Sequence, residues 1–203
     1  MRGEDAAARL AAEYGERVRV LRLDVTDAEA VAAAGEQVTA AGPLHGLVNN
    51  AGVALPGPLE FLPVAALREQ LEVNLLGQLA ATQAMLPALR AAHDPAGRIV
   101  MVGSIGGRIA APMLGAYHAA KFGLVGLTDT LRAELVPWRI RVILIEPGAI
   151  ATPIWTRGGA TADRLAEQMP AGPGSCTPAR SRRPAGTPPG RPATGCRRRQ
   201  PRR

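Results

Sequence analysis

Short apolar runs alternate with longer amphipathic stretches over most of this 203-residue chain. The apolar runs are rich in Val, Ile and Leu, a composition that is typical of parallel strands whose sheet is covered by helices on both faces. We predict four strands from these runs, at residues 18–23, 44–49, 98–103 and 140–146.

The stretches between these runs predict helices at residues 4–14, 28–41, 64–92 and 115–136. Asp24 and Asp27 flank the turn after the first predicted strand, and an aspartate there can cap the next helix. Strands that alternate with helices indicate an α/β fold with a parallel sheet. We therefore predict one such domain over residues 1–169.

Residues 170–203 differ sharply from the rest, because Pro, Gly and Arg dominate them. We predict that this tail is disordered, since almost none of its residues can join a core. Nine of the 24 basic residues lie from Arg180 onward, which leaves 15 basic against 17 acidic residues before it. The tail has three interpretations: a solvated segment, an Arg-rich arm that binds nucleic acid, or the product of a frameshift. No aromatic residue interleaves the arginines to stack on bases, which favours the first over the second.

Several functional classes are disfavoured by composition. No apolar run approaches the ~18 residues of a membrane span, and the first residues lack the apolar stretch of a signal peptide. The two cysteines, Cys176 and Cys196, both lie in the tail, so a cysteine-free body fits a reducing compartment. We expect a cytoplasmic protein. His45, His93 and His118 have no acidic or cysteine partners at metal-binding spacing, so we expect surface or turn histidines and no metal.

The strongest chemical signal is the set Ser104, Tyr117 and Lys121. Tyr117 and Lys121 are four residues apart in a predicted helix and therefore share one face. A nearby ammonium group favours the phenolate form of a tyrosine, which makes it usable as a general acid or base. Ser104 ends a predicted strand, where its hydroxyl can bind a substrate oxygen as charge develops there. Lys121 is also the one lysine in a chain with 24 basic residues, which indicates a position that arginine does not serve.

Together with further motifs, this set resembles the short-chain dehydrogenase/reductase family of the compact, single-domain type. The motifs are NNAG at 49–52, Asn74 in a long helix, Ser104 thirteen residues before Tyr117, YHAAK at 117–121 and EPGAIATP at 146–153. The resemblance implies a Rossmann-like, doubly wound parallel sheet. It also implies a catalytic set in which Tyr117 is the general acid/base and Ser104 orients the substrate. Lys121 would hold the cofactor ribose and favour the ionised form of Tyr117, and Asn74 would anchor a water in the proton relay.

The resemblance further implies a site for NAD or NADP. Asp24 and Val25 match the turn that holds the adenine ring, although Asp24 alone also fits a helix cap. The segment along the cofactor is matched by Asn49, Ala51 and Gly52, which also fit an ordinary turn. Pro147, Gly148 and Thr152 match the loop that contacts the nicotinamide and a phosphate, and a plain Pro-Gly turn explains the first two as well.

The chain departs from the family pattern at both ends. It contains no Gly-rich TGxxxGxG turn, the element that places the cofactor pyrophosphate at a helix N-terminus. We therefore expect an incomplete sheet, without the first βαβ segment and the final strand, in which the strand at 18–23 has no neighbour to pair with. The resemblance also matches Arg2 to the position of an Arg that pairs a 2′-phosphate, which weakly favours NADP.

These observations predict an oxidoreductase that transfers hydride reversibly between NAD(P) and a secondary alcohol or ketone. An apolar substrate is expected from the predicted pocket positions Ile105, Met113, Leu114, Ile154 and Trp155, with a lid at 161–169. If the fold is intact, the family resemblance implies a homo-oligomer. Two alternatives remain open: a catalytically impaired family member that acts as a binding or oligomerising module, and nucleic-acid binding through the tail.

Overall fold

The structure is a computed structural model that describes residues 2–93, 96–150, 152 and 154, with the side chains of residues 2–5 excepted. The chain divides into two units, Met1–Met169 and Pro170–Arg203, and the second unit lies outside the described residues. The disorder predicted for 170–203 therefore stays a prediction. No helix among the described residues is long and apolar enough to cross a membrane.

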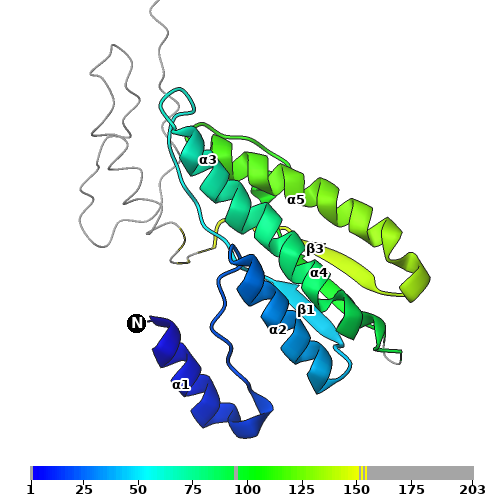
Figure 1. Ribbon diagram of the computed structural model, residues 1–203. Helices are drawn as coiled ribbons and strands as arrows, with labels where there is room; N and C mark the ends of the chain where they lie inside the picture. Colours follow the sequence, from blue (N-terminus) through cyan, green and yellow to red (C-terminus); the bar gives the residue numbers. More distant parts are fainter. Residues whose placement is uncertain (1, 94–95, 151, 153, 155–203) are drawn as a thin grey trace, which may run out of the picture. The chain divides into compact units, whose positions relative to one another are not determined.

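Three parallel strands form a sheet in the order β1-β2-β3 (Figure 1). They are β1 (Gly46–Asn49), β2 (Arg98–Val102) and β3 (Arg141–Ile145). These strands confirm three of the four predicted strands and the α/β class. The central strand carries the fully buried Ile99 and Met101, which anchor the core.

The helices confirm the predicted amphipathic stretches. Their bounds are α1 (Arg2–Tyr14), η1 (Gly15–Arg17), α2 (Ala28–Ala41), α3 (Val64–Leu71), η2 (Glu72–Leu76), α4 (Gly77–Arg90), η3 (Ile105–Gly107), α5 (Gly115–Glu134) and η4 (Val136–Trp138). The stretch at 64–92 is one continuous helical path in which η2 is a π-helical turn between α3 and α4. Such turns are rare and occur often at functional sites.

The strand predicted at 18–23 is wrong. These residues form no strand, and Val20, Leu21 and Leu23 are exposed. Within the described residues the sheet has no fourth strand beside β1. A strand needs a partner for its backbone donors and acceptors, so apolar β-branched residues alone do not keep this segment extended in a sheet.

Helices α4 and α5 cover one face of the sheet, and Leu89 and Leu124 from these helices are fully buried in the core. Helix α2 packs against α4 (Figure 1). At the close approach, a Cβ added to Gly35 would lie 2.6 Å from the Ala84 carbonyl oxygen. Glycine is therefore required at position 35 by the distance between the two helices.

Candidate active site

Helix α5 buries both Tyr117 and Lys121. Tyr117 is 6% exposed and Lys121 is 5% exposed, as their spacing of one helical turn predicts for a shared face. The Nζ atom of Lys121 lies 5.9 Å from the centroid of the Tyr117 ring. The pair is therefore not part of a solvated helix surface.

The Lys121 ammonium group is held at the carboxyl end of β2. Its Nζ atom donates a hydrogen bond of 2.8 Å to the Val102 carbonyl oxygen. Burial lowers the pKa of Lys121 to about 8, because the charged form loses hydration. At neutral pH the group is still cationic, and an ammonium carries three donors, of which Val102 takes one.

Ser104 begins the short helix η3 immediately after β2. Its Oγ atom accepts a hydrogen bond of 3.1 Å from the Gly106 amide, which caps the turn. The neighbouring Ile105 amide donates to the Pro147 carbonyl oxygen over 3.0 Å. The ends of β2 and β3 therefore bring Ser104 and the loop at Pro147 to the same edge of the sheet.

Gly106 connects this turn with helix α5. A Cβ at position 106 would lie 3.1 Å from Cε1 of Tyr117 and 3.1 Å from Nδ1 of His118. The peptide that binds the Ser104 hydroxyl therefore packs directly on the tyrosine ring. Ser104, Tyr117 and Lys121, which the sequence predicts as one site, lie on elements that are in contact.

His118 differs from its prediction as a surface or turn residue. It is 7% exposed, its Nδ1 atom lies 2.8 Å from the Gly106 carbonyl oxygen, and its Nε2 atom accepts from the Ala111 amide over 3.0 Å. The residue is buried because α5 turns it, like Tyr117, toward η3 and the loop that follows it. His45 and His93 are exposed, as predicted.

Asn74 lies in the π-helical turn η2 and is fully buried. Its side-chain oxygen accepts from the Val53 amide over 2.8 Å, and its nitrogen donates to the Val53 carbonyl over 2.9 Å. The side chain therefore bonds both the amide and the carbonyl of one residue, Val53, as a residue of a neighbouring strand would.

Asn74 is one of four polar residues at intervals of four along this helix, a row that the sequence analysis missed. The other members are Gln70, Gln78 and Thr82, and all four are at most 1% exposed. Gln70 bonds the Leu55 amide and the Val53 carbonyl, and Gln78 bonds the Ala51 carbonyl. We call this row the polar ladder. Polar residues at 70, 74, 78 and 82 on a face expected to be apolar were the available signal in the sequence.

The ladder fixes the predicted cofactor segment at Asn49, Ala51 and Gly52. Asn49 is buried at the end of β1, and its Nδ2 atom donates to the Thr82 hydroxyl over 2.7 Å. The Ala51 carbonyl is the one bound by Gln78. A Cβ at Gly52 would meet Asn74 Oδ1 at 3.5 Å, an ordinary contact, so the protein's own packing does not demand glycine there.

Asp24 and Val25 form a turn in which both residues make fixed contacts, Asp24 by hydrogen bonds and Val25 by packing. The carboxylate of Asp24 accepts from the Thr26 amide and hydroxyl, and these bonds lower the pKa of Asp24. Asp27, rather than Asp24, caps α2 by accepting from the Ala30 amide. Val25 packs so closely on Gly77 that a Cβ there would lie 2.8 Å from its Cγ2 atom. The turn therefore lies against the start of α4, next to η2.

The remaining predicted positions are more open. Gly148 and Thr152 are exposed after β3, and nothing lies within 4 Å of a Cβ added at Gly148. Of the predicted pocket residues, Ile105 and Met113 are exposed while Leu114 and Ile154 are half-buried. Trp155 and the predicted lid at 161–169 lie outside the described residues, as does the Arg2 side chain. The described residues contain no group of three or more side chains that would hold a metal.

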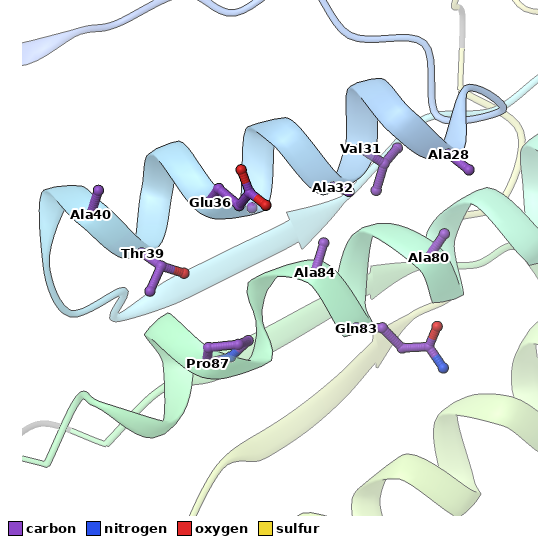
Figure 2. Close-up of a pocket in the computed structure, with 11 residues that line it drawn as sticks. Ala28, Val31, Ala32, Glu36, Thr39, Ala40, Ala80, Gln83, Ala84 and Pro87 are labelled. Atoms are coloured by element: carbon purple, nitrogen blue, oxygen red, sulfur yellow. The ribbon is translucent and has the colours of Figure 1, made fainter.

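A separate groove of about 730 Å³ runs between α2 and α4 (Figure 2). Small residues such as Ala32, Ala80 and Ala84 line it, with Glu36 and Thr39 among its polar residues. None of its lining residues belongs to the set around Tyr117. Most residues that line the groove are small and apolar. We therefore place the candidate active site at the sheet edge instead.

Comparisons with known proteins find a family and several relatives. The profile of a family described as short chain dehydrogenase matches residues 1–163. The 3-amino-tetrahydro-pyrrolizinone reductase of Xenorhabdus hominickii is 49% identical over 115 residues, which are 57% of this chain and 39% of that protein. Human 17-beta-hydroxysteroid dehydrogenase type 1 is 40% identical over 148 residues, which are 73% of this chain and 44% of that protein. This chain therefore spans less than half the length of both relatives.

A solved structure is similar over a comparable part of the chain. It is a short chain dehydrogenase from Burkholderia cenocepacia J2315 in complex with NADP, with a TM-score of 0.64 and 36% identity. The similarity covers 70% of this chain and 60% of that one. Its extent agrees with the Rossmann-like fold class predicted from the sequence.

Proposed function

This chain belongs to the short-chain dehydrogenase family, and we propose that it takes part in reversible hydride transfer between NAD(P) and a secondary alcohol or ketone. Tyr117 is the general acid/base of this proposal, and Ser104, Lys121 and Asn74 assist it. One observation carries the proposal: the buried Tyr117 and Lys121 pair beside the turn that holds the Ser104 hydroxyl.

Proton transfer is the step that these residues perform. In the direction of reduction, the Tyr117 hydroxyl gives its proton to the substrate oxygen, and in oxidation the phenolate takes a proton from the alcohol. The Lys121 ammonium stabilises the phenolate by its charge, which burial leaves poorly screened. Ser104 donates a hydrogen bond to the same substrate oxygen through its hydroxyl hydrogen, while its lone pair holds the Gly106 amide.

The described residues fit a nicotinamide nucleotide, which supplies or accepts the hydride when bound. Lys121 has two ammonium donors beyond its bond to Val102, and these suit the two hydroxyls of a ribose. The open space at Gly148 suits close contact between backbone and ligand. Asp24, Val25, Asn49, Ala51, Gly52, Pro147 and Thr152 complete the proposed cofactor site. NADP is favoured over NAD by Arg2 and is the cofactor bound to the Burkholderia cenocepacia protein.

An apolar substrate is favoured by the residues around the site. Ile105, Ile109 and Met113 are exposed on the loop between Ser104 and Tyr117. The loop is fixed at Met113, whose carbonyl accepts from the Gly57 amide over 2.7 Å. Met113 has a positive φ of 71°, a conformation that is uncommon for residues other than glycine and that clusters at functional sites. A substrate hydroxyl or carbonyl on a hydrophobic body matches this lining.

Assembly and location are also proposals, and both rest on the sequence. The family resemblance favours a homo-oligomer, and a body without cysteines favours a reducing, cytoplasmic environment.

The test compares Tyr117→Phe with Tyr14→Phe in the full chain. Titration with NADPH and with NADH, followed by nicotinamide fluorescence, measures binding, and hydride transfer to an apolar ketone measures turnover. We expect Tyr117→Phe to bind cofactor as the parent does and to lose at least about 100-fold in turnover, the usual contribution of a general acid. The control removes the hydroxyl of the exposed Tyr14 and leaves both unchanged. Turnover retained in Tyr117→Phe overturns the assignment, and absence of cofactor binding in the parent favours a binding module instead.

A further inference from the structure

The buried ring of His118 makes one hydrogen bond with each nitrogen. The Gly106 carbonyl oxygen, 2.8 Å from Nδ1, requires a donor there, and the Ala111 amide, 3.0 Å from Nε2, requires an acceptor. A neutral imidazole protonated on Nδ1 satisfies both, and an imidazolium ring satisfies only the first.

These two bonds hold the turn that carries Ser104. Gly106 donates its amide to the Ser104 hydroxyl and accepts from His118 through its carbonyl. One residue, Gly106, therefore connects the serine side chain to the residue that follows Tyr117, through its amide on one side and its carbonyl on the other. The second bond, at Ala111, fixes the far end of the same loop to the same ring.

We infer that His118 is a positioning residue for the proposed reaction, because its ring sets the Ser104 hydroxyl relative to Tyr117 through Gly106. This inference rests on the proposed function and adds a residue to it. His118 touches neither substrate nor cofactor in this role. The bond to Gly106 and the bond to Ala111 use different nitrogens of the ring, so a substitution can remove one and keep the other.

Ionisable side chains on the same helix and on the facing loop have contacts of their own. Tyr117 meets the His118 ring edge-on at 6.1 Å between ring centroids, and Lys121 lies on the same helix, where it bonds Val102. On the facing loop, Arg108 is paired with Glu146 at 2.7 Å.

Two substitutions separate the two bonds. The amide nitrogen of asparagine is as many bonds from Cα as Nδ1, so His118→Asn keeps a donor for Gly106 and loses the Ala111 bond. The side-chain oxygen of glutamine is as far along as Nε2, so His118→Gln keeps the acceptor for Ala111 and loses the Gly106 bond. His93→Asn and His93→Gln are matched controls at an exposed histidine.

The first measurement is amide hydrogen exchange by nuclear magnetic resonance on the full chain without cofactor. Exchange at Ala111 should be about fivefold or more faster in His118→Asn than in the parent, the effect of one lost hydrogen bond, while His118→Gln keeps the Ala111 amide protected. His118→Gln should shift the Gly106 amide signal and His118→Asn should not. Equal responses at Gly106 in both variants, or equal exchange at Ala111 in both variants, would overturn the inference.

The second measurement is turnover. We expect His118→Gln to lose about tenfold more kcat than His118→Asn, with the KM for cofactor unchanged, because it frees the carbonyl of Gly106, the residue whose amide holds the Ser104 hydroxyl. If both variants lose kcat equally, in proportion to equal losses in free energy of unfolding, His118 has only a structural role and the positioning role is refuted. If the parent chain shows no turnover, the proposed function fails on its own, and the Gly106 signal still decides whether His118 sets the Ser104 turn.

Discussion

Lys121 places a cation inside the protein with a backbone carbonyl as its hydrogen-bond partner. Burial of a charge destabilises the folded state unless the charge is paired and hydrogen-bonded. An arginine at this position would carry a larger, planar group that does not fit a point contact with Val102. The cost of burying Lys121 is therefore best explained by chemistry at Tyr117.

This burial predicts how stability depends on pH. The pKa of Lys121 is about 8 in the folded chain and ~10.4 in an unfolded one, so between these values the unfolded chain holds a proton that the folded chain has released. The free energy of unfolding should therefore rise between pH 8 and pH 10, by an amount on the order of 3 kcal/mol, and stay flat below pH 8 as far as Lys121 is concerned. Urea unfolding over this pH range measures it.

Two variants isolate the contribution of Lys121 to that profile. Lys121→Met has no ionisable group and should show no rise from this position. Lys121→Arg stays charged throughout the range, so it should also lack the rise but be less stable than Lys121→Met. A rise of the same size in all three chains would assign the effect to other groups.

At the scale of elements, the polar ladder of Gln70, Asn74, Gln78 and Thr82 replaces a strand. Among the described residues, no strand lies beside residues 51–55 on the side of η2, and the ladder's amide groups supply the donors and acceptors that such a strand would provide. The Oε1 atom of Gln78 is buried without a hydrogen-bond partner among the described residues. The ladder therefore stabilises the candidate cofactor segment through buried side-chain hydrogen bonds. In the protein interior, a polar group without a hydrogen-bond partner destabilises the folded state.

Removing one rung should destabilise the fold measurably. Gln70→Leu leaves the Leu55 amide buried without an acceptor, and we expect it to lower the free energy of unfolding by about 1–3 kcal/mol. Gln83→Ala on the same helix removes an exposed amide and should change it by less than about 0.5 kcal/mol. Urea titration of both variants decides this, and equal small effects would mean that the ladder bonds contribute little.

Two helical glycines give opposite predictions for the same substitution. Gly35→Ala places a Cβ 2.6 Å from the Ala84 carbonyl oxygen, so α2 and α4 must separate, at a cost of about 1–3 kcal/mol. Gly126→Ala in α5 meets nothing within 4 Å and should stabilise the protein by up to about 1 kcal/mol, because alanine favours the helix. Thermal unfolding midpoints that move in the same direction for both would contradict the packing of α2 on α4.

At the scale of the whole molecule, the sheet is unevenly covered. One face meets α4 and α5, whereas Val48, Ile143 and Ile145 are 63%, 39% and 47% exposed in the described part of the chain. Strands this apolar are typical of sheets with helices on both faces. The pattern agrees with the incomplete Rossmann-like sheet expected from the sequence.

Charge is also unevenly distributed over the molecule. The net charge is +7, and removing residues 170–203 with their nine arginines would leave 15 basic and 17 acidic residues, a net charge of −2. We expect the full chain to bind DNA weakly, without sequence preference and with affinity that falls steeply with salt, and the shortened chain to bind none. A fluorescence anisotropy titration with two unrelated duplexes measures this. Tight binding to one duplex at physiological salt would instead support a specific nucleic-acid-binding function of the tail.

The sequence by itself determined the features that depend on neighbouring residues. Helix α2 has its predicted bounds and its cap at Asp27, the strands β1, β2 and β3 lie within the predicted runs, and Tyr117 and Lys121 share one helix face. Each of these follows from local periodicity or from a cap a few residues away. The family motifs were equally readable, because they are fixed by spacing along the chain.

Only the tertiary structure decided what depends on distant partners. Residues 18–23 have the composition of a strand and form none, since pairing requires a second strand in space. His118 appeared to be an ordinary neighbour of Tyr117 until the turn at Gly106 and Ala111 folded against it. The polar ladder became visible when residues 51–55 lay beside η2. The polar row at 70–82 is present in the sequence, but contacts between segments far apart in sequence decide which groups pair.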